Sequence, residues 1–284
     1  MNQSLKLAIS NLKIEHNSSV EPKLRVISLG GGVQSSALYI MACENNLVDF
    51  AVFADTGWEP SDVYNHIESL KSLGNIPIVT VNNGNIRQDI EAAANGTRKF
   101  TSLPLFSISS DGKKGIIPRQ CTNDYKIVPI RRWLQKICKE KFGSISNHCV
   151  ELWIGISIDE YLRVKPSPVK YIRNRWPLME LGMSRDDCIE FLIHRGIYSP
   201  RSACIGCPFH SREEWIRICS DENNLRDLIK VDEMVRRIGK LKGANFLTNE
   251  RVPFRYSSFL SGGTKDNRAN VDDFNNECEG MCGL

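Results

Sequence analysis

The side chains of this 284-residue chain that are best suited to chemistry are its ten cysteines. Cys204 and Cys207 form a C-x-x-C pair around a glycine, and two thiolates at this spacing can bind one metal from a tight loop or act as a redox pair. Cys121 is a third potential ligand. Cys278 and Cys282, near the end of the chain, could supply a fourth ligand or carry sulfur. These residues indicate metal or sulfur chemistry.

A run of glycines between a strand and a helix is the second chemical feature. The apolar residues of 24–29 predict a buried strand, and the apolar run after Ser35 and Ser36 predicts a helix. Gly30, Gly31 and Gly32 lie between them and allow positive φ and close approach of the backbone. Because inward-facing amides and the helix dipole attract an anion, the stretch predicts a phosphate or sulfate site.

The elements that must position these residues alternate between strand and helix. Further strands are predicted at 49–54, 76–81 and 151–156, and a helix at 59–73. This order predicts an α/β fold with a doubly wound, mainly parallel sheet flanked by helices, whose ligands bind beyond the carboxyl ends of the strands. Asp55, Thr56 and Gly57 follow the second strand, so we expect them beside the glycine loop.

We expect three parts along the chain. Residues 1–23 are polar and irregular and form an N-terminal arm; residues 24–210 form the α/β domain with the anion site. Residues 211–284 form a C-terminal helical extension that ends in a flexible tail carrying cysteines.

Charge and hydropathy indicate which ligands the protein could bind and whether a segment could cross a membrane. The formal net charge is +4, with basic clusters over 113–141 and 163–175 that could bind phosphates of a nucleotide or a nucleic acid, or could be solvated helix faces. No stretch approaches the length of a membrane span, so we expect a cytoplasmic protein without a membrane partner.

The glycine loop resembles the SGGxDS phosphate loop of the adenine nucleotide α-hydrolase-like superfamily. This superfamily has the HUP-like fold and includes the N-type ATP pyrophosphatases with their PP-loop and the phosphoadenylyl-sulfate (PAPS) reductases. Gln34 stands where many of the pyrophosphatases carry an aspartate. The resemblance covers residues 24–210 in order, and its loop positions are Ser28, Gly30, Gly31, Gly32, Gln34, Ser35 and Ser36.

The resemblance implies a set of site residues. ATP with Mg²⁺ would be bound by the loop together with Asp55, Thr56, Gly57 and Gly155, and Arg119 and Lys126 would contact phosphate or sulfate. It implies a [4Fe-4S] cluster, with zinc as the alternative metal, on Cys121, Cys204, Cys207 and Cys278. It implies catalytic roles for Ser36, Lys126, Arg163 and Cys282.

The chain departs from the reductases of this superfamily at three places. It has one cysteine, Cys121, where the cluster-binding reductases have adjacent cysteines, and Ser157 where the family has an arginine. Its end, Met281 to Leu284, resembles the reductase tail with its catalytic cysteine but lacks the preceding Glu and the following His.

Three functions remain open on this basis. The first resembles the ATP pyrophosphatase subunit of DNA phosphorothioation systems: adenylation of a nucleic acid, DNA more than tRNA, for incorporation of sulfur from a cysteine desulfurase. The second is a PAPS or adenylyl-sulfate (APS) reductase that releases sulfite. The third is a tRNA thiolase or a non-catalytic nucleotide-binding subunit. A homodimer or a multi-subunit complex is compatible with each.

Overall fold

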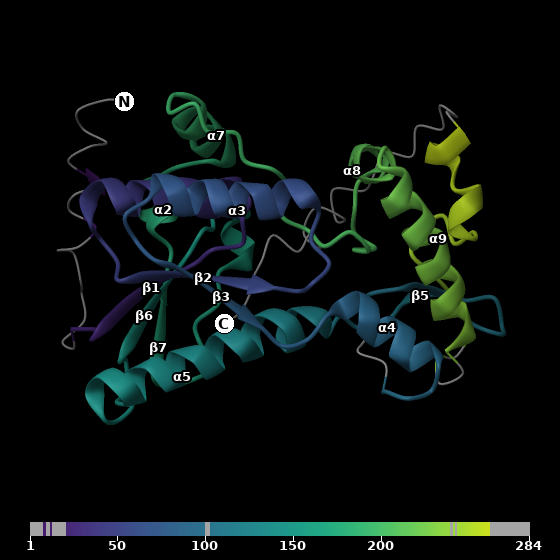
Figure 1. Ribbon diagram of the computed structural model, residues 1–284, viewed down its shortest axis with the longest axis horizontal. Helices are drawn as coiled ribbons and strands as arrows, with labels where there is room; N and C mark the ends of the chain where they lie inside the picture. Colours follow the sequence, from purple (N-terminus) through teal and green to yellow (C-terminus); the bar gives the residue numbers. More distant parts are fainter. Residues whose placement is uncertain are drawn as a thin grey trace.

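The computed structural model describes Ala8, Ile9, Leu12 and residues 21–99, 103–238, 241 and 243–261. At its centre is a five-stranded parallel sheet in the order β3-β2-β1-β6-β7 (Figure 1). Its strands are β1 (Leu24–Ser28), β2 (Phe50–Asp55), β3 (Ile78–Asn82), β6 (Val150–Ile154) and β7 (Ile172–Arg175). The strand order reverses beside β1, so the glycine loop lies at the switch point where such sheets bind ligands. The predicted α/β fold, a doubly wound and mainly parallel sheet flanked by helices, is confirmed.

Helices cover both faces of this sheet. Figure 1 shows α2 (Val33–Asn45), α3 (Ser61–Leu73) and α7 (Arg185–Ile193) on one face and α5 (Val128–Phe142) on the other. The short helix α6 (Pro177–Glu180) also packs against α2. Successive side chains of β1 point to opposite faces of the sheet and pack in two different cores. Ile27 packs with α2 and α3, whereas Val26 packs with α5. Ile9 and Leu12, from the predicted N-terminal arm, are buried in the α2 core.

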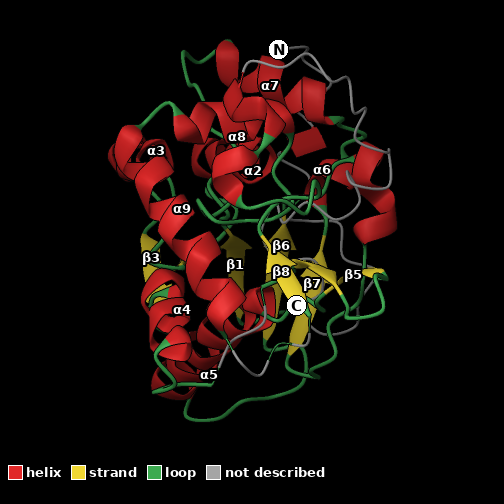
Figure 2. Cartoon of the chain, turned by 90° about the vertical axis from the view of Figure 1, so that its right-hand side faces the viewer, coloured by secondary structure: helices red, strands yellow, loops and turns green. Residues whose placement is uncertain are grey.

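A second group of elements lies at the carboxyl end of the sheet. It comprises α4 (Ile86–Ala94), α8 (Arg212–Cys219) and α9 (Glu222–Arg237) with a small antiparallel sheet of β5 (Lys114–Ile116), β4 (Phe106–Ile108) and β8 (Ala244–Phe246). The 3₁₀ helices η3 (Phe254–Tyr256) and η4 (Ser258–Ser261) complete it. Viewed from this side, α9 runs down in front of the parallel strands, and α8 lies above them at the level of α2 (Figure 2).

One apolar core joins the predicted extension to the earlier chain. Trp215 and Phe254 of the extension pack in the same cluster as Trp58 and Tyr125. The described part of 211–284 is therefore built against residues that precede it, and the boundary at residue 210 stays a prediction. Among the described residues, the structure has no helix both long and apolar enough to cross a membrane.

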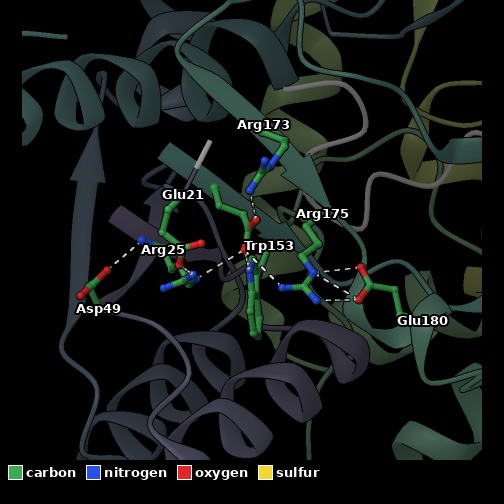
Figure 3. A network of polar contacts seen from close by, with 8 residues as sticks. Glu21, Arg25, Asp49, Trp153, Arg173, Arg175 and Glu180 are labelled. Atoms are coloured by element: carbon green, nitrogen blue, oxygen red, sulfur yellow. Dashed lines mark hydrogen bonds and ion pairs between the residues drawn. The ribbon is translucent and has the colours of Figure 1, made fainter. Parts of the chain in front are cut away.

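A buried carboxylate ties three strands together on the α2 face. Glu151 of β6 is fully buried, and its oxygens lie 2.8 Å from Arg173, 3.4 Å from Arg175 and 3.7 Å from Arg25. The indole N–H of Trp153 donates to the same carboxylate at 2.8 Å. Figure 3 shows the arginines converging from β1 and β7. Two of the five basic residues of the 163–175 cluster thus face a structural acid.

We predict that Glu151→Gln lowers the free energy of unfolding by about 3–5 kcal/mol, because it removes the fully buried negative charge that pairs with Arg173, Arg175 and Arg25. Urea denaturation measures this change. Glu68→Gln removes an exposed pair with Lys71 and is the matched control, with an expected loss below about 1 kcal/mol. Equal losses in the two variants would contradict the structural role given to Glu151.

Candidate functional site

The glycine loop presents its amides at the start of α2. Gly31 has φ +80°, a conformation that glycine adopts without strain, and Gly32 at the N-cap has no side chain to occupy the helix amides. Ser35 Oγ accepts from the Gly30 amide at 3.2 Å and donates to the Gly32 carbonyl at 3.1 Å. The loop is thus closed by its own serine, and the first amides of α2 and the helix dipole suit an anion.

Gly155 sets how closely β6 approaches this loop. A Cβ at Gly155 would lie 2.8 Å from the Ser35 amide nitrogen and 2.9 Å from its Cα. Backbone atoms cannot move aside as a flexible side chain can, so only glycine fits here. The predicted site residues Gly155 and Ser35 are therefore adjacent, and the carboxyl end of β6 forms one wall of the loop.

Gln34 and Arg163 belong to one hydrogen-bonded chain. The buried Gln34 amide donates to Glu160 Oε2 at 3.1 Å and to Ser157 Oγ at 3.4 Å, and Glu160 forms an ion pair with Arg163. An aspartate in place of Gln34 would face the Glu160 carboxylate, and two like charges at this distance repel. The neutral Gln34 amide is therefore compatible with the adjacent Glu160 carboxylate. Arg163 is held beside the loop by its ion pair with Glu160.

Ser36 lies on the inner side of α2. Its side chain is fully buried, and Oγ lies 2.8 Å from His66 Nε2 of α3 and 3.4 Å from Ser199 Oγ. Burial lowers the pKa of His66, so the imidazole is neutral near pH 7. The Ser36 hydroxyl thus fastens α2 to α3, and its predicted catalytic role stays a prediction.

Asp55, Thr56 and Gly57 form a tight turn after β2. Asp55 Oδ1 accepts from the Gly57 amide at 2.7 Å and from the Tyr64 hydroxyl at 2.8 Å, and Gly57 has φ +72°. Thr56 Oγ1 donates to Glu59 Oε1 at 2.8 Å. The other carboxylate oxygen of the buried Glu59 has no hydrogen-bond partner among the residues that the structure describes.

The loop of the C-x-x-C pair docks on this turn. The Ile205 amide donates to the Trp58 carbonyl at 2.8 Å, and a Cβ at Gly206 would lie 2.1 Å from the Trp58 ring. Ser202, just before the pair, packs on the glycine loop, since a Cβ at Gly32 would lie 2.8 Å from its Oγ. One segment therefore contacts the turn after β2 and the glycine loop together.

The buried His210 side chain holds the same loop through hydrogen bonds to its backbone. Burial lowers the pKa of His210 to about 4, so the ring is neutral near pH 7, and Nε2–H donates to the carbonyls of Cys204 at 3.0 Å and Ile205 at 3.2 Å. Trp58, Ser202 and His210 were not among the site residues predicted from the sequence. The glycine between the two cysteines was the available signal, because it marks a position where another group approaches the backbone.

Three predicted metal ligands meet in one small cavity. Cys121, Cys204 and Cys207 line it together with Arg119, Lys126 and Thr56. The Cys204 thiol donates to Cys207, which raises the pKa of Cys204 and lowers that of Cys207; the charges of Arg119 and Lys126 lower the pKa of Cys207 further. The cavity therefore favours a thiolate at Cys207.

The π-helix η1 (Asn123–Ile127) turns Lys126 into this cavity. Its i+5 bond runs from the Val128 amide to the Asn123 carbonyl. Tyr125, Lys126 and Ile127 are consecutive and all buried, and they face the extension core, the cavity and the α5 core respectively. π-helical turns are frequent at functional sites, where they redirect a side chain.

The remaining cysteines lie apart from this cavity or outside the described residues. Cys138, Cys149 and Cys188 are buried in the apolar cores. Cys278 and Cys282 fall outside the described residues. Within the described ranges, no three His, Cys, Asp or Glu side chains are close enough together to bind a single metal ion.

Residues 25–142 match the family model of the phosphoadenosine phosphosulfate reductase domain. This part of the chain is a domain of the adenine nucleotide α-hydrolase-like superfamily. The reductase-type domain contains the glycine loop, the turn after β2, Cys121 and Lys126. The recognition of the superfamily from the glycine loop is confirmed.

A phage protein matches a shorter part of the chain. An uncharacterized 37.8 kDa protein in the gpa 5' region of Escherichia phage 186 is 34% identical over 88 residues. These residues make up 31% of this chain and 24% of the phage protein, so the chain matches about a quarter of the length of that relative.

Solved structures with a similar arrangement share little sequence. A PAPS reductase from Candida auris in a phosphate complex has a TM-score of 0.43 and 12% identity, covering 70% of this chain and 89% of its own. The U34-tRNA thiolase NcsA from Methanococcus maripaludis with its [4Fe-4S] cluster has a TM-score of 0.43 and 13% identity, covering 84% and 80%. An NH3-dependent NAD synthetase from Campylobacter jejuni has a TM-score of 0.40 and 12% identity, covering 85% and 98%. We draw no functional conclusion from these likenesses.

We predict that Gly155→Ala weakens ATP binding at least about tenfold, because the new Cβ displaces the Ser35 backbone and opens the glycine loop. Isothermal titration calorimetry measures the affinity. Gly115→Ala on β5 is the control, since its Cβ would meet only the mobile Ser107 hydroxyl at 3.1 Å. Unchanged ATP binding by a folded Gly155→Ala variant would remove the loop as the phosphate site.

Proposed function

We propose that this protein is an ATP pyrophosphatase that adenylates a nucleic-acid acceptor, DNA more than tRNA, for the incorporation of sulfur. The observation that carries the proposal is the cavity in which Cys121, Cys204 and Cys207 meet Arg119 and Lys126. It lies against the turn after β2, and its C-x-x-C segment packs on the glycine loop. Thiols, cations and a phosphate-type loop are thus gathered at one edge of the sheet.

In the first step, ATP with Mg²⁺ lies with its phosphates on the amides of the glycine loop. An acceptor oxygen attacks the α-phosphorus, the bond to the bridging oxygen of pyrophosphate breaks, and pyrophosphate leaves. The contribution of the protein is positioning and the stabilisation of developing negative charge. Backbone amides, Lys126 and Arg163 would supply the positive ends of these interactions.

In the second step, sulfur arrives as the persulfide of a cysteine desulfurase. Its terminal sulfur forms a bond to the activated acceptor atom, and AMP leaves with the former acceptor oxygen. A dithiol reductant supplies the two electrons that break the remaining sulfur–sulfur bond and leave the new sulfur on the acceptor. Cys282, the predicted catalytic cysteine, would carry sulfur between the two, since the thiolate is the reactive form.

We propose that the same thiols hold a [4Fe-4S] cluster, with zinc as the alternative metal. Cys121, Cys204 and Cys207, which line one cavity, would hold it, with Cys278 as the proposed fourth ligand. When bound, it would supply an iron atom that coordinates sulfur.

A second candidate is PAPS or APS reduction, which the family model over residues 25–142 favours. There the Cys282 thiolate would attack the sulfate sulfur, the nucleotide would leave with the bridging oxygen, and a dithiol would release sulfite from the thiosulfonate. A tRNA thiolase or a non-catalytic nucleotide-binding subunit would retain the same loop without this step.

The deciding experiment measures two products from anaerobically purified protein. Pyrophosphate release from ATP is followed alone, with plasmid DNA and with bulk tRNA, and sulfite release is followed from PAPS and APS. We expect pyrophosphate without sulfite, with stimulation by DNA. Sulfite without pyrophosphate would establish the reductase instead, and silence in both assays would leave a binding subunit.

We predict that anaerobically purified protein is brown and contains iron and acid-labile sulfide, and that Cys204→Ala loses the colour. Visible absorption and iron analysis measure this outcome. Cys219→Ala, on α8 and outside the cavity, is the matched control and should retain the colour. A colourless wild-type protein with stoichiometric zinc would overturn the cluster.

A further inference from the structure

The connection between β6 and β7 exposes apolar side chains at the edge of the site. The 3₁₀ helix η2 (Ile158–Arg163) follows β6 directly, and each of its six residues is at least partly exposed. Tyr161 is 60% exposed, Leu162 67% and Ile158 43%. Large apolar side chains gathered on one short surface helix commonly mark an interaction site.

This helix is attached to the glycine loop. Glu160 precedes Tyr161 and accepts from Gln34 in the first turn of α2 at 3.1 Å. The backbone at Ile158 is fixed as well, because its amide donates to the Met183 carbonyl at 3.0 Å. Tyr161 and Leu162 therefore stand on a fixed support beside the predicted phosphate site, and a molecule bound on them would lie close to a nucleotide in the loop.

Charge on the same connection points to a polyanion. Its two acids are engaged, since Asp159 accepts from the Arg185 amide at 3.0 Å and Glu160 pairs with Gln34 and Arg163. Lys165 and Lys170 lie farther along the connection and are exposed. Exposed aromatic and aliphatic side chains followed by lysines are the combination with which proteins bind single-stranded nucleic acid, by stacking bases and pairing phosphates.

We propose that Ile158, Tyr161, Leu162, Lys165 and Lys170 form the surface that holds an unpaired strand of the nucleic-acid acceptor. Tyr161 stacks on a base, and the lysines contact phosphates of the same strand. The inference rests on the proposed function for the identity of the acceptor. It adds where the acceptor binds, and that the strand must be unpaired there.

The test is fluorescence anisotropy with a labelled 20-nucleotide single strand, its duplex, and RNA of the same sequence. We expect wild-type protein to bind single strands more tightly than the duplex. Tyr161→Ala should weaken single-strand binding by about fivefold or more, and Tyr161→Trp should retain it. Replacing both lysines by alanine should reduce the salt dependence, log K against log salt, by about 1.4. Tyr256→Ala, 69% exposed on η3, is the matched control and should bind as wild type.

ATP binding by the same variants separates the two proposals. Loss of strand binding with unchanged ATP affinity in Tyr161→Ala supports the surface. A protein that binds ATP but no oligonucleotide, or a Tyr161→Ala variant with wild-type strand affinity, would overturn the surface and leave the nucleotide chemistry standing. A dimer in light scattering that Tyr161→Ala converts to a monomer would show an interface between copies instead, and would also overturn it.

Discussion

The contact between Trp58 and Gly206 is the constraint on which the site depends. The Trp58 ring occupies the space that any side chain at Gly206 would fill, and the Ile205 amide bonds the Trp58 carbonyl. This contact brings a loop from late in the chain against the turn that follows β2. It thereby sets the position of Cys204 and Cys207 relative to Cys121 and the glycine loop. His210 completes the arrangement by holding the carbonyls of the pair from within the core.

Two carboxylates, Glu151 in the sheet and Glu160 beside the glycine loop, hold polar side chains in place elsewhere in the structure. On the α2 face of the sheet, Glu151 gathers arginines from β1 and β7, so much of the basic character of this region serves the sheet. Beside the glycine loop, Glu160 receives Gln34 and Arg163. Both carboxylates have partners from distant segments, Glu151 from β1 and β7 and Glu160 from α2, and these partners are therefore held in fixed orientations.

The fold was predictable because its signals are local and repeated. The mostly apolar runs of β1 and β6 are typical of parallel strands in a sheet with two covered faces, and the helix between β1 and β2 indicates a parallel crossover. The glycine loop was also predictable, since a strand, three glycines and a helix start specify an anion site without reference to the rest of the chain. The domain model over 25–142 agrees with that interpretation.

The sequence by itself determined four of the five strands of the parallel sheet, the helices α2 and α3, and the glycine loop, but not β7 or the antiparallel strands β4, β5 and β8. It could not determine that Ser36 bonds His66, that Gln34 bonds Glu160, or that Arg173 and Arg175 face a buried acid. Only the tertiary structure decided these partners, because each pair joins segments between 22 and 126 residues apart and depends on how helices pack against the sheet. Local patterns report backbone conformation, whereas the direction and partner of a polar side chain are set by which distant surface covers it.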